Sequence, residues 1–534
     1  MYKQITSSRY SNLLIGVVLL LITLAAYFNI LQNKLFFDDE ELIYKNKYIQ
    51  NLSYLPRFFT QNMIAGAGKI SNMYRPLLLL SLALDYRLWN LNPMGYHLTS
   101  IILHFLNGWL VFLILQKLFK NKFISFFTSL LFIVHPIQTE AVAYASGRSD
   151  PLFTFFLLGS LWFSISYLKS QKSSIALFIG SVILFIFSLL SKESAVILPL
   201  LTVLMLIVME NKNLSRFKTV LLVGVYLTVD LIYIILRLTK LNFLNSFNFY
   251  DVPTLYSSHL GIRLFTFSKV FFDYLLVLFF PQDLIVARKP DIITSIFNPW
   301  VLFFAVFLIV AIFISVQKRK SNKIYFFSLT WFFITILPVS GIVPINNIES
   351  EHYLYLPSIA VFSLISFLIY KNWIYLKNNE IKRLIGVLVI LGILLLFFRT
   401  VVRNYDWRDP ESFYTLSLKQ SPWNINMRHN LAMTYSENGK INEAILSYQR
   451  IIGLNNNFPN AHHNLANIYR KSGLYTEAET EYLKALEIDP NFYFSYFSLS
   501  EMYRETQQLE KLQKILDKIK NIKKLEEIYT LQQK

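Results

Sequence analysis

Four consecutive carboxylates, Asp38 to Glu41 in the stretch FFDDEEL, form the densest acidic cluster of the sequence. Like charges this close repel one another unless cations, protons or water relieve the repulsion, so the cluster fits a solvated loop or a polar task. An aspartate can remove the proton of an attacking hydroxyl group, and hard carboxylate oxygens suit Mg or Mn. Asp38 and Asp39 are therefore candidates for a catalytic base or for metal ligands.

The segment HPIQTEAVAYASGRSD, residues 135 to 150, is the second place where polar side chains gather. It contains His135, Glu140, Arg148 and Asp150 directly after an apolar run. A charge buried at the centre of a bilayer costs about 3 kcal/mol, so we expect these side chains at the membrane rim or in a cavity. His135 precedes a proline, and the alternative for this residue is the capping of a helix end.

Several cationic side chains are suited to binding a phosphate group. Arg75 precedes Pro76, Lys192 and Glu193 stand in the short turn SKES, and Arg237 ends an apolar run. Arginine binds phosphate through two parallel hydrogen bonds. The alternatives are that Lys192 pairs with Glu193 and that Arg237 anchors a helix end at the lipid interface.

Two other positions complete the candidate site. His97 and His104 lie seven residues apart, which places them on one face of a helix. Without a third ligand they make a weak metal site, so hydrogen bonding to a headgroup or to the backbone is favoured. The segment IESEHYLYLPS contributes Glu351, His352 and Tyr353.

The composition defines the setting of these residues. The chain has 534 residues, of which 54% are hydrophobic and 16% aromatic, and a mean hydropathy of +0.42. These values indicate a polytopic membrane protein rather than a soluble globule. The net charge of +18 agrees with basic cytoplasmic loops, and we expect no nucleic-acid partner. There is no cysteine, which excludes disulfides and thiolate metal sites.

Eleven apolar runs have about the length of a membrane span. They lie near residues 11–30, 97–117, 123–142, 151–168, 174–190, 195–209, 218–236, 299–316, 324–340, 354–370 and 384–399. The stretches Pro76 to Trp89 and Leu264 to Phe280 are also apolar but carry charges, so they are either spans or helices lying at the interface.

Five short basic loops, at residues 117–122, 169–172, 212–218, 318–323 and 371–383, set the orientation. All five face the cytoplasm only if neither doubtful stretch crosses the membrane. With eleven spans, the N-terminus is then inside and the C-terminus outside. Under this topology every polar motif described above lies on the outer, non-cytoplasmic face.

Beyond residue 400 the composition becomes soluble and polar, and a repeat of period 34 begins. Leu431 recurs as Leu465, Gly439 as Gly473 and Tyr448 as Tyr482. Small residues at such positions let paired helices pack closely, a pattern that resembles the tetratricopeptide repeat. A third copy replaces the glycine with Gln507, and a Lys- and Glu-rich capping helix follows. We therefore predict a membrane domain at 1–400, a linker helix at 401–423, and repeats at 424–534.

The motifs YRPLLLLSLALDYRLWNLNPMGYHLTSIILH, HPIQTEAVAYASGRSDPL, SKES, EHYLYLPS and RNYDWRDPESF occur in this order before the repeats. Together they resemble the transmembrane and tetratricopeptide-repeat O-mannosyltransferases and bacterial relatives of that design. The resemblance implies an all-α, GT-C-like membrane domain of about 11 spans followed by a tetratricopeptide α-solenoid. His352 stands where the resemblance leads us to expect arginine.

The resemblance also implies a reaction. A GT-C glycosyltransferase takes a sugar, here mannose-like, from a polyprenyl-phosphate lipid and transfers it to a hydroxyl group, here of protein Ser or Thr. Asp38 or Asp39 would act as base or metal ligand, because the attacking hydroxyl must lose its proton. The phosphate candidates are Arg75, His135, Arg148, Lys192 and Arg237. The repeats would bind the acceptor protein or peptide.

Other functions stay open at this point. A GT-C enzyme could modify a glycan or a lipid instead of a protein. A non-enzymatic scaffold is another alternative, although a single span would be enough to anchor repeats. A transporter would place polar groups near the membrane midplane, whereas here they gather at one rim. The composition favours a bacterial inner membrane with periplasmic repeats, and the lumen of the endoplasmic reticulum is the alternative.

Overall fold

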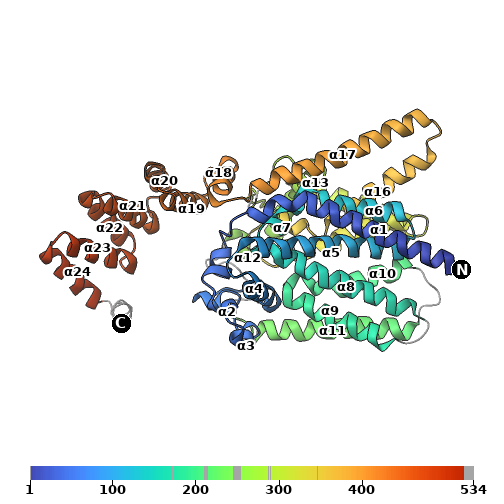
Figure 1. Ribbon diagram of the computed structural model, residues 1–534, viewed down its shortest axis with the longest axis horizontal. Coiled ribbons are helices and arrows are strands. Elements are labelled where there is room, and N and C mark those ends of the chain that lie inside the picture. The colour runs from blue at the N-terminus through green and yellow to red at the C-terminus, as the bar shows by residue number, and fades with distance from the viewer. Residues whose placement is uncertain are drawn as a thin grey trace. The chain divides into compact units, whose positions relative to one another are not determined.

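The computed structural model describes residues 2–170, 174–209, 215–244, 254–284, 286, 288, 290–345 and 347–521 (Figure 1). Within these ranges the regular structure is helical, with one isolated β-bridge between Arg288 and Glu349. The predicted all-α class is confirmed. The chain divides into unit 1, Met1–Arg408, and unit 2, Asp409–Lys534. The stretch predicted as a linker is therefore shared between the two units.

Unit 1 is a helical membrane domain. Seven of its described helices are long and apolar enough to span a membrane: Ser11–Gln32, Pro93–Phe119, Ser146–Lys169, Arg216–Leu238, Pro299–Lys318, Ser358–Tyr375 and Asn379–Tyr405. An eighth span is the bent pair Lys122–Val134 and Pro136–Ala143. Three shorter apolar helices, Ile175–Ser191, Glu193–Met209 and Lys323–Val339, cover the other predicted runs. The count of eleven is reached only when these short helices are included.

Helix α5 (Pro93–Phe119) is central to unit 1. It packs between α1 (Tyr2–Tyr27) and α8 (Ser149–Lys169), and α8 in turn packs against α9 (Ile175–Ser191) (Figure 1). The other membrane helices are α10 (Leu198–Met209), α11 (Arg216–Leu238), α14 (Pro299–Lys318), α15 (Lys323–Ile336), α16 (Ser358–Tyr375) and α17 (Asn379–Tyr405). The loop residues Lys172 and Lys212, used above for orientation, lie outside the described ranges.

A break in one span creates the irregular segment that carries many of the polar residues. Helix α6 (Lys122–Val134) ends at His135, whose backbone is extended at φ −79° and ψ 128°, and the path bends by 55°. Pro136 explains the break, since proline lacks an N–H and disfavours the helical conformation of the residue before it. The chain continues through 3₁₀ turns and α7 (Thr139–Ala143) before α8 begins.

The two doubtful apolar stretches are not among the candidate spans of the described chain. Helix α4 (Pro76–Trp89) has 14 residues and is about 21 Å long, which is short of a bilayer's hydrocarbon core. Its buried apolar side chains pack against the short helices α2 (Lys47–Gln50) and α3 (Leu55–Phe58). Helix α13 (Leu260–Phe279) carries three charges.

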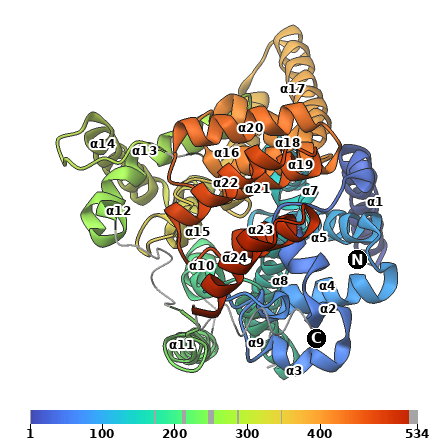
Figure 2. The same cartoon turned by 90° about the vertical axis from the view of Figure 1, so that its left-hand side faces the viewer.

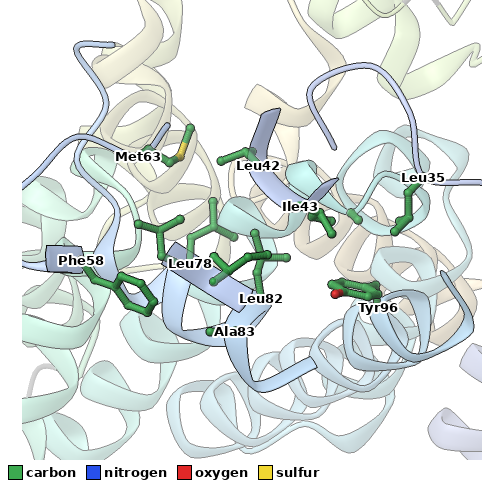
Figure 3. Packing of buried hydrophobic residues seen from close by; sticks show 12 residues of the cluster. Leu35, Leu42, Ile43, Phe58, Met63, Leu78, Leu82, Ala83 and Tyr96 are labelled. Atoms are coloured by element: carbon green, nitrogen blue, oxygen red, sulfur yellow. The ribbon is translucent and has the colours of Figure 1, made fainter. Parts of the chain in front are cut away.

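The acidic stretch is anchored by its own apolar residues. Leu42 and Ile43 follow the carboxylates and are almost fully buried. They pack in one cluster with Leu78 and Leu82 of α4 (Figure 3). Burying these side chains holds the carboxylates beside the membrane helices instead of leaving them on a free loop.

Unit 2 consists of antiparallel helix pairs (Figure 2). Its helices are α18 (Pro410–Gln420), α19 (Ile425–Glu437), α20 (Ile441–Leu454), α21 (Pro459–Lys471), α22 (Tyr475–Ile488), α23 (Tyr493–Glu505) and α24 (Leu509–Asn521). Gly439 and Gly473 turn between paired helices at φ 75° and 78°, where only glycine avoids strain. Gln507 takes the same left-handed conformation, so the third repeat keeps the turn without its glycine. The tail beyond residue 521 lies outside the described chain.

Candidate active site

Asp39 joins the acidic loop to the irregular segment between α6 and α8. Its Oδ1 accepts hydrogen bonds from the backbone N–H of Ser146, at 2.8 Å, and from the Ser146 hydroxyl. Its Oδ2 accepts one from the N–H of Phe36, at 3.3 Å. The side chain is 1% exposed, and burial raises the pKa of Asp39 to about 7. With both oxygens engaged, Asp39 holds the loop in place and has little capacity left for a substrate or a metal.

Asp38 is the carboxylate that stays available. Its backbone N–H donates to the hydroxyl of Tyr144 at 3.0 Å, while its side chain reaches the surface. Surrounding protein raises the pKa of Asp38, and Glu41 adds to this effect. The Tyr144 hydroxyl and His352 act in the opposite direction and lower it. The Tyr144 hydroxyl connects Asp38 to the residues that directly follow α7.

The other two carboxylates of the cluster are neutralised at the surface. Lys45 contacts Glu40 at 3.1 Å and Glu41 at 3.2 Å, and Lys69 contacts Glu41 at 2.9 Å. No group of three His, Asp or Glu side chains suited to a metal ion occurs among the described residues. A divalent cation would have Asp38 as its available carboxylate, and the suggestion of Mg or Mn stays a prediction.

Glu140, in the helix α7 that directly precedes Tyr144, forms a pair with His352. One Glu140 oxygen accepts the backbone N–H of His352 at 2.9 Å, and the other lies 2.8 Å from His352 Nδ1. Glu140 is buried and His352 is partly exposed. If Nδ1 donates to the carboxylate, the opposite ring nitrogen is left for another partner.

Two ion pairs bring the predicted cations next to this pair. Lys192 contacts both oxygens of Asp150, at 2.7 and 2.8 Å, and also lies 5.8 Å from the ring centre of Tyr353. Arg75 binds Glu193 with two hydrogen bonds of 2.8 and 3.2 Å. Lys192 and Glu193 thus bind different partners rather than each other.

Tyr353 lies between two of these groups, because its ring centre is 4.5 Å from that of His352 and 5.8 Å from Lys192 Nζ. Lys192 binds Asp150, which directly follows Ser149, and the Ser149 hydroxyl accepts a hydrogen bond from Arg75. We define the outer polar cluster as the side chains that meet here: Asp38, Arg75, Glu140, Tyr144, Asp150, Lys192, Glu193, His352 and Tyr353. Only Tyr144 was missed from the sequence, since a tyrosine in an apolar stretch gives no signal for a hydrogen bond to a distant loop.

Five other predicted residues make their polar contacts within the protein. Arg148 is fully buried, pairs with Asp85, and donates to Ser81, Ser100 and the carbonyl of Tyr96. Arg237 donates to the carbonyls of Leu241 and Asn72. His97 bonds the carbonyl of Asn33, and Glu351 pairs with Arg403. His135 accepts the N–H of Ile137 and bonds the carbonyl of Leu278, so it caps a helix end, as its alternative interpretation expected.

Fold and repeats together define a polytopic helical membrane protein with C-terminal tetratricopeptide repeats. Tetratricopeptide-repeat family models match residues 432–473, 459–492 and 481–514. The chain is 28% identical over 453 residues to the protein O-mannosyl-transferase F38B6.6 of Caenorhabditis elegans, covering 82% of this chain and 62% of that protein. It is 27% identical over 475 residues to the human protein O-mannosyl-transferase TMTC3, covering 82% and 50%. The resemblance indicated by the motifs is confirmed, and the chain spans about half to three-fifths of these relatives' length.

Two solved structures are also similar. One is ArnT from Cupriavidus metallidurans bound to undecaprenyl phosphate, with 15% identity, coverage of 88% of this chain and 77% of that one, and a TM-score of 0.45. The other is the apo oligosaccharyltransferase of Archaeoglobus fulgidus, with 12% identity, coverage of 74% and 56%, and a TM-score of 0.44. At these scores the structural likeness is weak.

The raised pKa of Asp39 predicts how stability changes with pH. The folded protein holds this proton up to about pH 7, whereas an unfolded chain releases it near 3.8. The midpoint temperature of thermal unfolding, measured in detergent, should therefore fall as the pH rises between these two values, and it should level off above them. Glu349 and Glu351, whose pKa burial also raises to about 7, contribute in the same direction.

Asp39→Asn should remove part of this decline, and Asp291→Asn, which changes an exposed carboxylate, should leave it intact. An unaltered decline in Asp39→Asn would contradict the assignment of a buried, protonated Asp39.

Proposed function

We propose that this chain is a membrane glycosyltransferase that transfers a mannose-like sugar from a polyprenyl-phosphate donor to a hydroxyl group, that of Ser or Thr in a protein, on the non-cytoplasmic face. One observation carries the proposal: the outer polar cluster combines an exposed carboxylate, Asp38, with the cations Arg75 and Lys192. The similarity to protein O-mannosyl-transferases over 82% of the chain supports the same reaction.

In this proposal Asp38 acts as the general base. It removes the proton from the acceptor hydroxyl while the hydroxyl oxygen forms a bond with the anomeric carbon of the sugar. The bond between that carbon and the phosphate oxygen breaks, and the polyprenyl phosphate leaves with its negative charge. This leaving group needs cations and hydrogen-bond donors more than it needs an acid.

Arg75 is the best-placed donor for that phosphate. Two of its nitrogens bind Glu193, and Nη1 donates to the neutral hydroxyl of Ser149, at 3.3 Å. Exchanging this hydroxyl for a phosphate oxygen strengthens the interaction, because the guanidinium then meets an opposite charge. Lys192 and His352 add positive charge or a donor from the other side of the cluster.

We further propose that the repeats recruit the acceptor protein. Tetratricopeptide arrays offer extended binding surfaces, and Asn430 and Asn464, which occupy equivalent positions in adjacent repeats, are candidates for lining that surface. In the structure, Asn464 bonds His429 of the preceding repeat at 2.9 Å, so it also bridges neighbouring repeats. An outward-facing cluster fits a bacterial inner membrane with periplasmic repeats, and it also fits the endoplasmic reticulum with luminal repeats.

Asp38→Asn should lower sugar transfer by about a hundredfold to ten-thousandfold, which is the usual contribution of a general base. The measurement is transfer of radiolabelled sugar to an acceptor peptide, with membrane abundance as a check on folding. Glu40→Gln is the matched control, because Glu40 is exposed and pairs with Lys45 at the surface. Wild-type turnover in Asp38→Asn would exclude Asp38 as the base.

Removing residues 424–534 should raise the Michaelis constant for a full-length acceptor protein far more than that for a short peptide. The physical reason is that the repeats add binding surface without touching the reacting atoms. Donor-lipid hydrolysis, measured in the same preparation, reports whether the membrane domain is intact. If the truncated enzyme modifies the full-length protein as well as the intact enzyme does, the recruitment proposal is wrong, and a glycan or lipid acceptor becomes the better explanation.

A further inference from the structure

The stretch that leads out of α17 packs against the acidic loop. Trp407, in the motif RNYDWRDPESF, is 1% exposed. Its ring stacks on Tyr144 with centroids 5.0 Å apart and an interplanar angle of 23°. On its other contact it lies 6.4 Å from the ring of Phe36, which precedes the carboxylates. Trp407 therefore lies against Phe36, at the start of the acidic loop, and against Tyr144, which binds that loop.

Hydrogen bonds also fix the residues around Trp407 relative to those before the acidic loop. Five hydrogen bonds join the end of α17 to the end of α1 and the residues after it. The donors and acceptors are Asn29 to the carbonyl of Val401 at 2.9 Å, Asn33 to that of Asn404 at 3.3 Å, Asn404 to the carbonyl of Ala26 at 2.9 Å and to Oδ1 of Asn29 at 2.8 Å, and the Lys34 N–H to the carbonyl of Arg408 at 2.9 Å. The indole is thus fixed relative to the start of the acidic loop.

The backbone next to Asp38 is strained. Phe37 adopts φ 63°, a left-handed conformation that a bulky side chain rarely takes. Such a conformation persists only where surrounding contacts impose it. Here the Phe37 ring lies 6.0 Å from that of Tyr144, and the following N–H, that of Asp38, donates to the Tyr144 hydroxyl.

We propose that Tyr144 and Trp407 are positioning residues for Asp38: the indole fixes the phenol, and the phenol holds the Asp38 backbone and the strained turn in the orientation that aims the carboxylate at its substrate. This inference rests on the proposed function for its effect on catalysis. The positioning itself does not depend on what reaction the protein performs.

The test compares Tyr144→Phe, which removes the hydroxyl and keeps the ring, with Trp407→Leu and Trp407→Phe. Matched controls are Tyr226→Phe, a buried tyrosine that bonds Ser160 and Ser164, and Trp331→Leu, a buried tryptophan that donates to the carbonyl of Leu356. Two quantities are measured on the full chain in detergent: hydrogen–deuterium exchange of the peptide covering residues 36–42, and kcat and KM for sugar transfer.

Tyr144→Phe and Trp407→Leu should raise the exchange rate of the loop about tenfold, because an opened turn exposes its amides. They should lower kcat about ten- to a hundredfold with little change in the donor KM, since misplacing a base by about 1 Å has effects of this size. Trp407→Phe keeps a stacking ring and should recover most of both quantities. The two controls should change neither.

Unchanged loop exchange in Tyr144→Phe would overturn the inference, and so would an equal change in Trp331→Leu, since that would indicate general destabilisation. If Trp407→Leu does not reach the membrane, Tyr144→Phe and Trp407→Phe decide. If the wild-type protein transfers no sugar, the proposed function fails, while the exchange rates still decide whether Tyr144 and Trp407 position Asp38.

Discussion

The buried carboxylate of Asp39 is the contact on which the candidate site depends. Two hydrogen bonds, from the Ser146 N–H and hydroxyl, join a loop near the N-terminus to a segment more than a hundred residues away. A third, from the Phe36 N–H, closes the turn within the loop. This contact and the Tyr144 hydroxyl together hold Asp38 beside the end of α7, the helix that carries Glu140. The contact exists because α7 ends at Ala143 and Ser146 begins a new 3₁₀ turn, and the first N–H groups of a helical turn are left for partners outside it.

Paired burial explains how so many charges lie close to the hydrocarbon. Arg148 with Asp85, Lys192 with Asp150, and Arg403 with Glu351 are each almost fully buried. A single buried charge is strongly unfavourable, whereas a pair with further hydrogen bonds is tolerated, although removing one partner leaves the other uncompensated. The same rule separates structural charges from available ones: Arg148 has its donors filled by protein, while Arg75 keeps one donor on a neutral hydroxyl.

Local features were predictable from the sequence, and tertiary pairings were not. Hydropathy located the helices, and Leu431 and Leu465 revealed the repeats, because both signals depend on nearby residues. Helix α4 has the same bounds as the short, charged apolar stretch that the sequence showed, Pro76 to Trp89. The alternative interpretation of Lys192, pairing with its neighbour Glu193, is wrong: Lys192 binds Asp150, because the extended backbone of Lys192 directs adjacent side chains apart. The roles of Tyr144, in an apolar stretch, and of Trp407, in the polar motif RNYDWRDPESF, could not be predicted, because an aromatic residue does not show in the sequence which distant loop it contacts.

The most direct test of the account is transfer by the purified chain in liposomes. Polyprenyl-phosphate mannose, radiolabelled in the sugar, is supplied with a peptide rich in Ser and Thr. The account predicts that label moves to the peptide, that one polyprenyl phosphate is released for each sugar transferred, and that alkaline β-elimination removes the label from the peptide. The folded protein is also tested with a glycan and a lipid as acceptors and with other hexose donors. If no acceptor becomes labelled from any donor, the proposed glycosyl transfer is contradicted.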